Sequence, residues 1–425
     1  MKTRQLDINH LDLGELIRPN DGLVWGQGAG EPLPLIEALV AQRHRIGPVS
    51  AFIGGISYNN TIAPAHTDGI HFSAFGAMGG WIRELARAHV LDLIPCHLSQ
   101  IPSYFAAGAI PADVVFVQVS PPNRKGEYSY SLVSEYVPAA LERARVVVAE
   151  VNERAPWTCC EMPLTEERIT HFVHTSRPLT HHPSREFGPV EKAIAESVGR
   201  YIDDGTTVEI GIGAIPDAIM AAIADRRDLG FHSGLLSDRV ADLIESGAMT
   251  NARKPIDTGI ATCTALLGTS RLYDFARENP AIRMFPVTHT HNALVLARLD
   301  RFVAINSAVE VDLTGQINAE TAAGLVVGGV GGQVDFVRGA QLAARGRSII
   351  ALPSTARGGS VSRIVARLGG VVTTARSDAD VIVTEYGVAE LKGRTIAERM
   401  QRMAAISHPD FREELEREVH SALKA

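Results

Sequence analysis

Short runs of apolar residues, rich in valine and isoleucine, alternate along the chain with longer amphipathic stretches. Four such runs lie at residues 114–119, 146–151, 349–352 and 381–383. The amphipathic stretches at residues 33–42, 216–224 and 394–406 repeat their apolar positions with a helical period, and the last one leads into a His-Pro stop. Strands that are apolar throughout are typical of parallel sheets covered by helices on both faces. The pattern therefore predicts an α/β fold with mainly parallel sheets.

One arrangement of elements occurs twice. Asp21-Gly22 precedes a short apolar strand, a glycine loop and a helix, and Asp204-Gly205 precedes the same series. A second apolar strand follows in each half, at residues 49–55 and 230–236, which is the order of a β-α-β unit. The repetition predicts two related, open α/β domains.

A domain boundary is expected between residues 176 and 191, where prolines and histidines interrupt the periodicity. We predict an N-terminal domain over residues 1–185 and a C-terminal domain over residues 186–425. Clefts form readily where two domains meet, so the active site is expected at their interface.

Composition narrows the classes of function. The chain has 425 residues with a net charge of −7, and its basic residues form no stripe, so nucleic acid is not an expected partner. Its four cysteines lack C-x-x-C spacing and are interpreted as reduced thiols. The charged N-terminus lacks an apolar signal region, and no run is long enough to span a membrane. These features predict a cytoplasmic protein.

A first glycine loop lies between an expected strand and an expected helix, and consists of Gly211, Ile212, Gly213, Ala214 and Ile215. Backbone N–H groups at such a helix start can bind an anion or a polarised carbonyl. The third glycine of a dinucleotide fingerprint is missing. A tight turn that needs positive φ is the alternative interpretation.

A second loop is denser in glycine, and comprises Gly328, Gly329, Val330, Gly331, Gly332 and Gln333. Its N–H groups can form an oxyanion hole, although a bulge-rich turn would also explain the glycines. Residues 353–363 combine hydroxyl groups with Arg357 and Arg363 after an expected strand, which suits contacts to phosphate or carboxylate.

Five long motifs resemble one known family. They are VQVSPP at 117–122, AINSAVEVDLTGQ at 304–316, GVGGQVDF at 329–336, ALPSTARGGSVSRIV at 351–365, and VIVTEYGVAELKGRT at 381–395 with HPDF at 408–411. In this order they are similar to the acetyl-CoA hydrolase / 4-hydroxybutyrate CoA-transferase family, and the resemblance covers roughly residues 15–415.

The resemblance implies two α/β domains, with coenzyme A bound mainly by the C-terminal one and the acceptor acid on the N-terminal side. It also implies a glutamate that attacks the acyl-CoA and then carries CoA as a thioester, with no metal and no tightly bound cofactor. Carried over by motif, Gly211 to Ile215 and the glycine loop at 328–333 would contact CoA or its thioester.

One departure from the family affects the mechanism. The family nucleophile ends a strand that reads L-G-x-H-[ST]-E, and the matching segment here is LGFHSG, which ends in Gly234. Glycine has no side chain that could form an anhydride. Three explanations remain open: another glutamate reaches the thioester, the acceptor or water attacks directly, or activity has been lost.

Glu31 is the candidate substitute, because it starts a helix in the loop that echoes the CoA loop. A charge that complements the helix dipole is the alternative role. Glu310 and Glu320 flank the approach to the second glycine loop, and Glu310 is interpreted as a structural carboxylate.

Removal of a carboxylate at position 234 would also make room for a bulkier or doubly charged acid, such as itaconate or succinate. A second carboxylate would need a cation, and the candidates are Arg357, Arg363, His232 and the pair His289 and His291. The His pair could share one side of a strand, where a hydrogen-bonded structural role is the alternative to a metal site. Residues 58–60 either line the acceptor pocket or form a turn.

Three functional classes follow. A CoA-transferase would move CoA from an acyl-CoA to a small carboxylate, a hydrolase would use water instead, and a binding protein would retain CoA affinity without turnover. Acyl-CoA and a small carboxylate are therefore the expected partners. The chain is expected to form a homodimer or a larger homo-oligomer.

Overall fold

A computed structural model describes residues 4–424, which form two compact units. Unit 1 contains the residues up to Pro183 together with Thr262–Thr290 and Val326–Gly331. Unit 2 contains Ser184–Ala261, His291–Leu325 and the residues from Gly332 onward. Among the described residues, no helix is both long and apolar enough to cross a bilayer.

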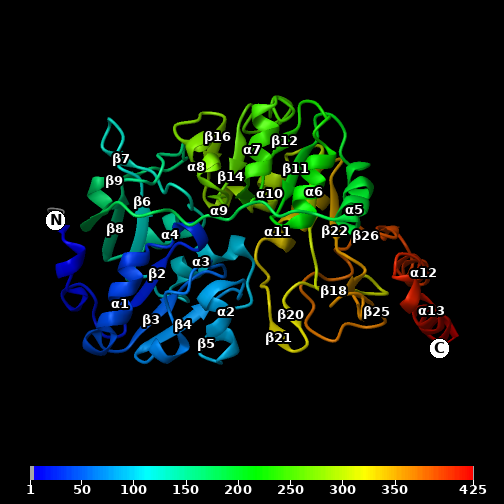
Figure 1. The fold of residues 1–425 in the computed structure, drawn as a ribbon, viewed down its shortest axis with the longest axis horizontal. Coiled ribbons are helices and arrows are strands. Elements are labelled where there is room, and N and C mark those ends of the chain that lie inside the picture. Colours follow the sequence, from blue (N-terminus) through cyan, green and yellow to red (C-terminus); the bar gives the residue numbers. More distant parts are fainter. Residues whose placement is uncertain (1–3, 425) are drawn as a thin grey trace. The chain divides into compact units, whose positions relative to one another are not determined.

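Unit 1 is built on an eight-stranded sheet in which all neighbouring strands are parallel. The strand order is β1 (Arg4–Leu6), β10 (His171–Thr175), β8 (Val146–Asn152), β6 (Val114–Val119), β2 (Gly22–Trp25), β3 (Val49–Phe52), β4 (Ile70–Ala74) and β5 (Leu91–Leu93). Every residue of β6 and β8 is buried, as expected for central strands with helices on both faces. Figure 1 shows these strands in blue to blue-green.

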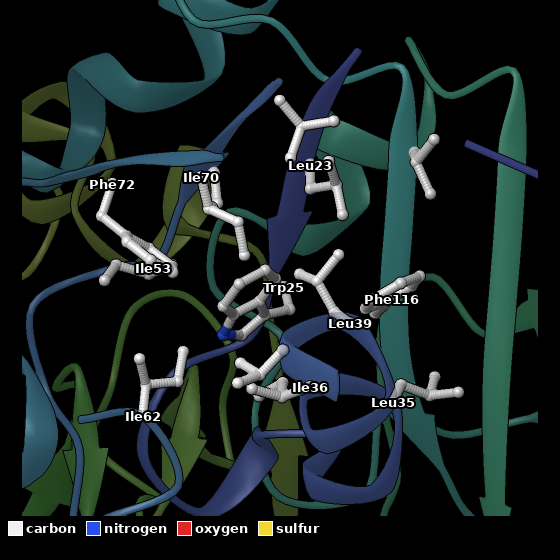
Figure 2. Packing of buried hydrophobic residues seen from close by; sticks show 14 of the residues in the cluster. Leu23, Trp25, Leu35, Ile36, Leu39, Ile53, Ile62, Ile70, Phe72 and Phe116 are labelled. Carbon is white, nitrogen blue, oxygen red and sulfur yellow. The ribbon is translucent and has the colours of Figure 1, made fainter. Parts of the chain in front are cut away.

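Helix α1 (Leu33–Ile46) packs its apolar side on this sheet. Leu35, Ile36 and Leu39 are fully buried, and Figure 2 shows them next to Trp25 of β2 and Phe116 of β6. The rings of Trp25 and Phe116 stack with centroids 6.3 Å apart. The segment of unit 1 that ends at Pro183 also contains the α-helices α2 (Gly80–Arg87), α3 (Ile101–Ala107) and α4 (Val137–Leu141).

Two later segments complete unit 1. The first carries β14 (Ala261–Cys263), β15 (Ala265–Leu266), α8 (Ser270–Ala276), β16 (Ile282–Met284) and α9 (Val287–Thr290). Backbone bridges join Ala265 to Val133 and Met284 to Cys160. The short strands β7 (Glu127–Tyr128) and β9 (Leu164–Thr165) also belong to unit 1 and pair with each other in antiparallel orientation. A single division of the chain at residues 185/186 therefore does not describe the units.

Unit 2 is built on a six-stranded sheet. The order is β12 (Gly230–Phe231), β11 (Thr207–Ile210), β17 (Phe302–Asn306), β22 (Arg347–Ala351), β26 (Val381–Thr384) and β27 (Gly387–Glu390). Only the last strand is antiparallel to its neighbour. The carboxyl ends of the first five strands consequently meet along one edge of the sheet, where ligands bind in open α/β folds.

Helices and small β-elements surround this sheet. The helices are α5 (Pro189–Gly199), α6 (Ala214–Ala222), α7 (Asp238–Glu245), α10 (Ala293–Leu296), α11 (Gln333–Leu342), α12 (Ile396–Ala405) and α13 (Pro409–Lys424). A three-stranded sheet contains β19 (Ile317–Asn318), β18 (Glu310–Asp312) and β25 (Ile364–Val365). The remaining strands are β13 (Leu235–Leu236), β20 (Thr321–Ala322), β21 (Leu325–Val326), β23 (Thr355–Ala356) and β24 (Val361–Ser362).

The predicted fold class is confirmed. The four apolar runs form β6, β8, β22 and β26, and the three amphipathic stretches lie largely in α1, α6 and α12. The repeated arrangement is also present, since β2-α1-β3 and β11-α6-β12 are both β-α-β units with parallel strands. The stretch from 176 to 188, in which a boundary was predicted, contains no helix or strand.

Candidate active site

The first glycine loop opens onto a cavity of about 340 Å³ within unit 2. The loop connects β11 to α6, and Gly213 adopts a φ of +126° as the N-cap of that helix. Glycine alone adopts this conformation without strain. All five residues of this loop, Gly211 to Ile215, line the cavity, and all five were among those predicted to contact CoA. The start of α6 thus presents N–H groups and the positive end of the helix dipole to a bound ligand.

The other walls of the cavity come from neighbouring strand ends. Asn306 ends β17 and Ser307 follows it, while Ala351 ends β22 and Pro353 follows shortly after. Glu191 of α5 also contributes to the lining. The cavity therefore occupies the carboxyl edge of the parallel sheet, which is the usual ligand position in this fold class.

Arg363 supplies the positive charge of this cavity. Burial lowers the pKa of its guanidinium, and its Nη1 donates to the Ala308 carbonyl oxygen at 3.4 Å. Among the described residues, its buried Nε has no hydrogen-bond partner. A partly buried guanidinium with an unused donor is suited to a phosphate or carboxylate ligand.

A second cavity, of about 600 Å³, shares Arg363 with the first. Its lining also includes Arg357 and the carboxylate of Glu310, which accepts a hydrogen bond from Asn318 at 3.0 Å. Thr373 Oγ1 donates to Glu320 at 2.7 Å. Both glutamates therefore take part in hydrogen bonds inside unit 2, as interpreted for Glu310 from the sequence.

Beneath the first cavity, β11 carries a buried glutamate. Glu209 Oε2 accepts hydrogen bonds from Asn306 Nδ2 at 2.8 Å and from the backbone N–H of Ile305 at 3.1 Å. Burial raises the pKa of Glu209 to about 8, although both hydrogen bonds act to lower it. Asn306 therefore connects a buried, titratable carboxyl group to the cavity wall.

The second glycine loop is divided between the units. Gly329, in unit 1, packs on Gly76 so closely that a β-carbon on Gly329 would lie 2.8 Å from the Gly76 α-carbon. The Gly328 carbonyl accepts a backbone bond from Ala77, and the Gly331 carbonyl accepts one from Leu98. Close backbone packing accounts for the glycine at 329 without a ligand.

The last two residues of this loop belong to unit 2. Gln333 starts α11, is buried, and donates from Nε2 to Thr374 Oγ1 at 3.0 Å. Gly332 lies against the imidazole of His291, since a β-carbon on Gly332 would be 2.5 Å from Nε2. Neither Gly332 nor Gln333 lines the cavity at the start of α6.

Two aromatic rings lie close to Gly234. A β-carbon on Gly234 would lie 3.3 Å from both Cε1 and Nε2 of His291, and 3.9 Å from the ring of Phe336. The rings of His291 and Phe336 have centroids 4.5 Å apart. An imidazole thus lies beside this position, and the interpretation that the missing carboxylate leaves room for a bulkier acid stays a prediction.

The two histidines of the H-x-H pair do not share a strand. His289 lies in helix α9 of unit 1, whereas His291 follows that helix and belongs to unit 2. Burial lowers the pKa of His291 to about 3, so its imidazole is neutral at physiological pH. His232 is fully buried, with Nδ1 3.9 Å from an Asp257 carboxylate oxygen. Within residues 4–424 no cluster of three metal-ligating side chains occurs.

Glu31 is enclosed inside unit 1 with 2% of its surface exposed. Its carboxylate accepts hydrogen bonds from Ser57 Oγ at 3.0 Å, from Trp81 Nε1 at 3.2 Å and from Asn59 Nδ2. Burial raises the pKa of Glu31 to about 8, against the lowering effect of these bonds. This arrangement favours a structural role over that of a nucleophile. Asn59, which was a candidate for the acceptor pocket, is therefore part of the hydrogen-bond network around Glu31.

Sequence reasoning missed three side chains. Glu209 was visible as a charged residue inside an apolar strand, and Asn306 stood within a quoted motif, but neither signal revealed their contact. The third, Glu135, is buried in unit 1 with a positive φ of 43°. Gln27 Nε2 donates to its Oε1 at 2.9 Å, while burial raises its pKa to about 7.

Comparisons with known proteins agree with these features. Residues 7–163 match the model of the acetyl-CoA hydrolase/transferase N-terminal domain, and residues 268–419 match that of the C-terminal domain. The chain is 38% identical over 405 residues to 4-hydroxybutyrate coenzyme A transferase of Clostridium kluyveri, with 94% of each chain covered. It is 35% identical over 423 residues to succinyl-CoA:cyclohexane-1-carboxylate CoA transferase of Geobacter metallireducens, with 97% and 94% covered.

Among solved structures, RipA from Yersinia pestis superimposes with a TM-score of 0.91 at 31% identity, covering 99% of this chain and 97% of RipA. The similarity thus extends over both units and includes the strand ends that form the cavity. Both domain models match the chain, and the two relatives match it over nearly their full length. The chain therefore belongs to the acetyl-CoA hydrolase/transferase family.

Proposed function

We propose that the chain is a CoA-transferase that moves CoA from an acyl-CoA to a small carboxylic acid. The observation that carries the proposal is the cavity at the carboxyl edge of the unit 2 sheet, where the start of α6 and Arg363 form one anion-binding wall. The names of the two relatives support the same reaction class.

We place the CoA thioester along the two cavities that share Arg363. CoA is an elongated molecule with phosphate groups, and the guanidinium between the cavities is suited to bind one of them. The N–H groups at Gly213 to Ile215 then remain for the thioester carbonyl or the pantetheine amides. Gly328 to Gly331 lie in unit 1, and their contact with the thioester stays a prediction from the sequence.

For the mechanism we favour direct attack by the acceptor. A carboxylate oxygen of the acceptor attacks the thioester carbonyl carbon, the C–S bond breaks, and CoA leaves as the thiolate with formation of a mixed anhydride. The thiolate then attacks the carbonyl carbon of the acceptor, the anhydride C–O bond breaks, and the donor acid leaves as a carboxylate. The absence of a carboxylate at position 234 and the enclosure of Glu31 support this route over an enzyme-bound glutamyl thioester.

The acceptor remains open between monocarboxylates and dicarboxylates such as succinate or itaconate. Since His291 lies close to position 234, we look for the site of a second carboxylate elsewhere. Arg357 in the second cavity is the cation that we assign to it.

Hydrolysis is the second candidate function. Water in place of the acceptor carboxylate would attack the same thioester carbon, and the family includes hydrolases by its description. A binding protein without turnover is the third candidate.

Mass spectrometry separates the three. The purified chain is incubated with acetyl-, succinyl- or butyryl-CoA, alone and with a panel of mono- and dicarboxylic acids. A new acyl-CoA that forms only with one acceptor supports the transferase and identifies its substrate. Free CoA that rises without any acceptor supports the hydrolase, whereas binding without change supports the third candidate. Intact-protein mass spectrometry accompanies the assay, because a protein that gains the mass of CoA contradicts direct attack.

A further inference from the structure

Arg363, which lines both cavities, carries a charge that no carboxylate neutralises by direct contact. Among residues 4–424, its guanidinium donates only to the Ala308 carbonyl oxygen, from Nη1 at 3.4 Å, and forms no ion pair. Its buried Nε has no hydrogen-bond partner in this part of the chain. Donors of this kind remain available to a ligand only if nearby carboxylates are held away from them.

Glu385 is a carboxylate near enough to affect Arg363. Burial lowers the pKa of Arg363, and the charge of Glu385 acts in the opposite direction. Glu385 directly follows β26, so it lies at the same carboxyl edge of the sheet as the first cavity. Opposite charges at short range attract each other, so a contact of its own must keep this carboxylate from pairing with the guanidinium.

Ser354 holds both oxygens of that carboxylate. Its backbone N–H donates to Glu385 Oε2 at 2.8 Å, and its Oγ donates to Oε1 at 2.5 Å. The serine is fully buried, and its carbonyl oxygen accepts a hydrogen bond from the backbone N–H of Arg363 at 2.8 Å. Ser354 therefore contacts both charged residues, although it lines neither cavity.

We propose that Ser354 is a positioning residue, which keeps the carboxylate of Glu385 away from Arg363 so that the guanidinium stays available to a phosphate of CoA. The inference rests on the proposed function, since it needs CoA at Arg363. A guanidinium paired with a carboxylate offers a phosphate fewer donors and less charge, because both anions need the same N–H groups.

Ser354→Ala is the first variant. Alanine keeps the backbone N–H but removes the hydroxyl group, which leaves Glu385 Oε1 without its donor. We expect the carboxylate to turn towards Arg363 and the affinity for CoA, measured by calorimetry, to fall about tenfold. Ser407→Ala is the matched control, because Ser407 is another fully buried serine of unit 2, and its Oγ donates to the Ala404 carbonyl oxygen at 2.6 Å. The control should bind CoA as wild type does.

The double variant Ser354→Ala/Glu385→Gln separates this role from a general loss of structure. A glutamine has no charge with which to pair with Arg363, so the double variant should regain affinity to within about threefold of wild type. A serine that only supported the fold would give losses that add. A double variant that binds CoA as weakly as Ser354→Ala, or more weakly, overturns the proposal.

Glu385→Gln alone provides a test that does not depend on the folding of Ser354→Ala. Its amide can accept from the Ser354 N–H and donate to Oγ, so the local contacts persist while the negative charge is lost. We expect affinity for CoA to rise about two- to threefold at low salt, and the gain to vanish near about 1 M salt. Weaker binding of CoA by this variant contradicts the proposal.

Pantetheine, the part of CoA without phosphates, shows whether the effect passes through the phosphate contact. Its affinity should be the same for all these proteins, and a parallel loss in Ser354→Ala would overturn the proposal. These binding measurements need no turnover. If the CoA affinities follow the expected pattern but no acyl-CoA is converted, the proposed transferase fails and the role of Ser354 stands. Transfer activity together with an unchanged CoA affinity in Ser354→Ala has the opposite meaning.

Discussion

The imidazole of His291 lies against Gly234, with Cε1 and Nε2 both 3.3 Å from the ideal β-carbon position. The backbone at Gly234 does not have a positive φ, so it is the ring and not the main chain that restricts this position. In a family whose nucleophile is expected at the end of this strand, an uncharged imidazole therefore lies beside the position at which a carboxylate is expected.

A double-mutant cycle tests this relationship. Gly234→Glu alone should lower the free energy of unfolding by about 1–3 kcal/mol, because the new side chain collides with His291. Addition of His291→Ala should recover at least half of that loss, which urea titration of the four proteins would measure. Strictly additive effects would show that the two positions do not compete for space.

The same double variant also tests the mechanism. With a carboxylate at 234 and the ring removed, incubation with acyl-CoA should add the mass of CoA to the intact protein. The wild type and either single variant should show no such addition. A CoA adduct on wild-type protein would instead point to a nucleophile elsewhere in the chain.

The strained glycine at the start of α6 should be essential for ligand binding. Gly213→Ala requires alanine at a φ of +126°, so the loop must change shape, and we expect affinity for CoA to fall at least tenfold by calorimetry. Gly259→Ala also places a β-carbon at a positive φ, with open space around it and away from the cavity lining. This control should lose stability but bind CoA normally. Equal affinities in both variants would remove the loop from the site.

Arg363→Met should weaken CoA binding by roughly 10- to 100-fold, as expected for the loss of a charge-assisted hydrogen bond. The salt dependence of binding should decrease in parallel, because the guanidinium no longer attracts the phosphates. Arg338→Met is the control, since Arg338 is half-exposed and paired with Asp378 on the surface of unit 2. An unchanged dissociation constant in Arg363→Met would place the phosphates elsewhere.

Glu31→Gln distinguishes a structural carboxyl group from a nucleophile. We expect turnover to persist, because the side chain is enclosed by three donors. A total loss of turnover with intact CoA binding would restore Glu31 as the nucleophile.

Glu31 also makes stability depend on pH. Its pKa in the folded chain, about 8, lies above the value of 4.5 for a free side chain, so its protonated form is the one that folding favours. The stabilisation is fully present below the unfolded pKa and is lost as the pH rises through about 8. Glu135 and Glu209 act in the same direction. Wild type should therefore be less stable in urea at pH 9 than at pH 6, and Glu31→Gln should reduce the difference, unlike the exposed variant Glu37→Gln.

The sequence predicted the elements better than it predicted their contacts. Apolar runs located β6, β8, β22 and β26 because a buried parallel strand needs apolar residues on both faces. Likewise, two glycines between a strand and a helix located the cavity loop. Pairs such as Glu209 with Asn306, or Gly234 with His291, join residues at least 57 positions apart, and no local pattern encodes such a meeting.

After Pro183 the chain adds two further segments to unit 1, and this connectivity affects folding during synthesis on the ribosome. Unit 1 begins at the N-terminus but receives its last segment only at Gly331, about 150 residues after Pro183. At roughly 5–20 residues per second, synthesis of the residues that complete unit 1 takes roughly 7–30 s more. During that interval the nascent unit 1 exposes apolar surface that its later segments will cover. A gene cut at codon 184 would encode a first fragment that lacks part of unit 1, whereas the second fragment would contain all of unit 2 and the missing segments of unit 1. We therefore expect this connectivity to affect the need for chaperones during expression rather than catalysis.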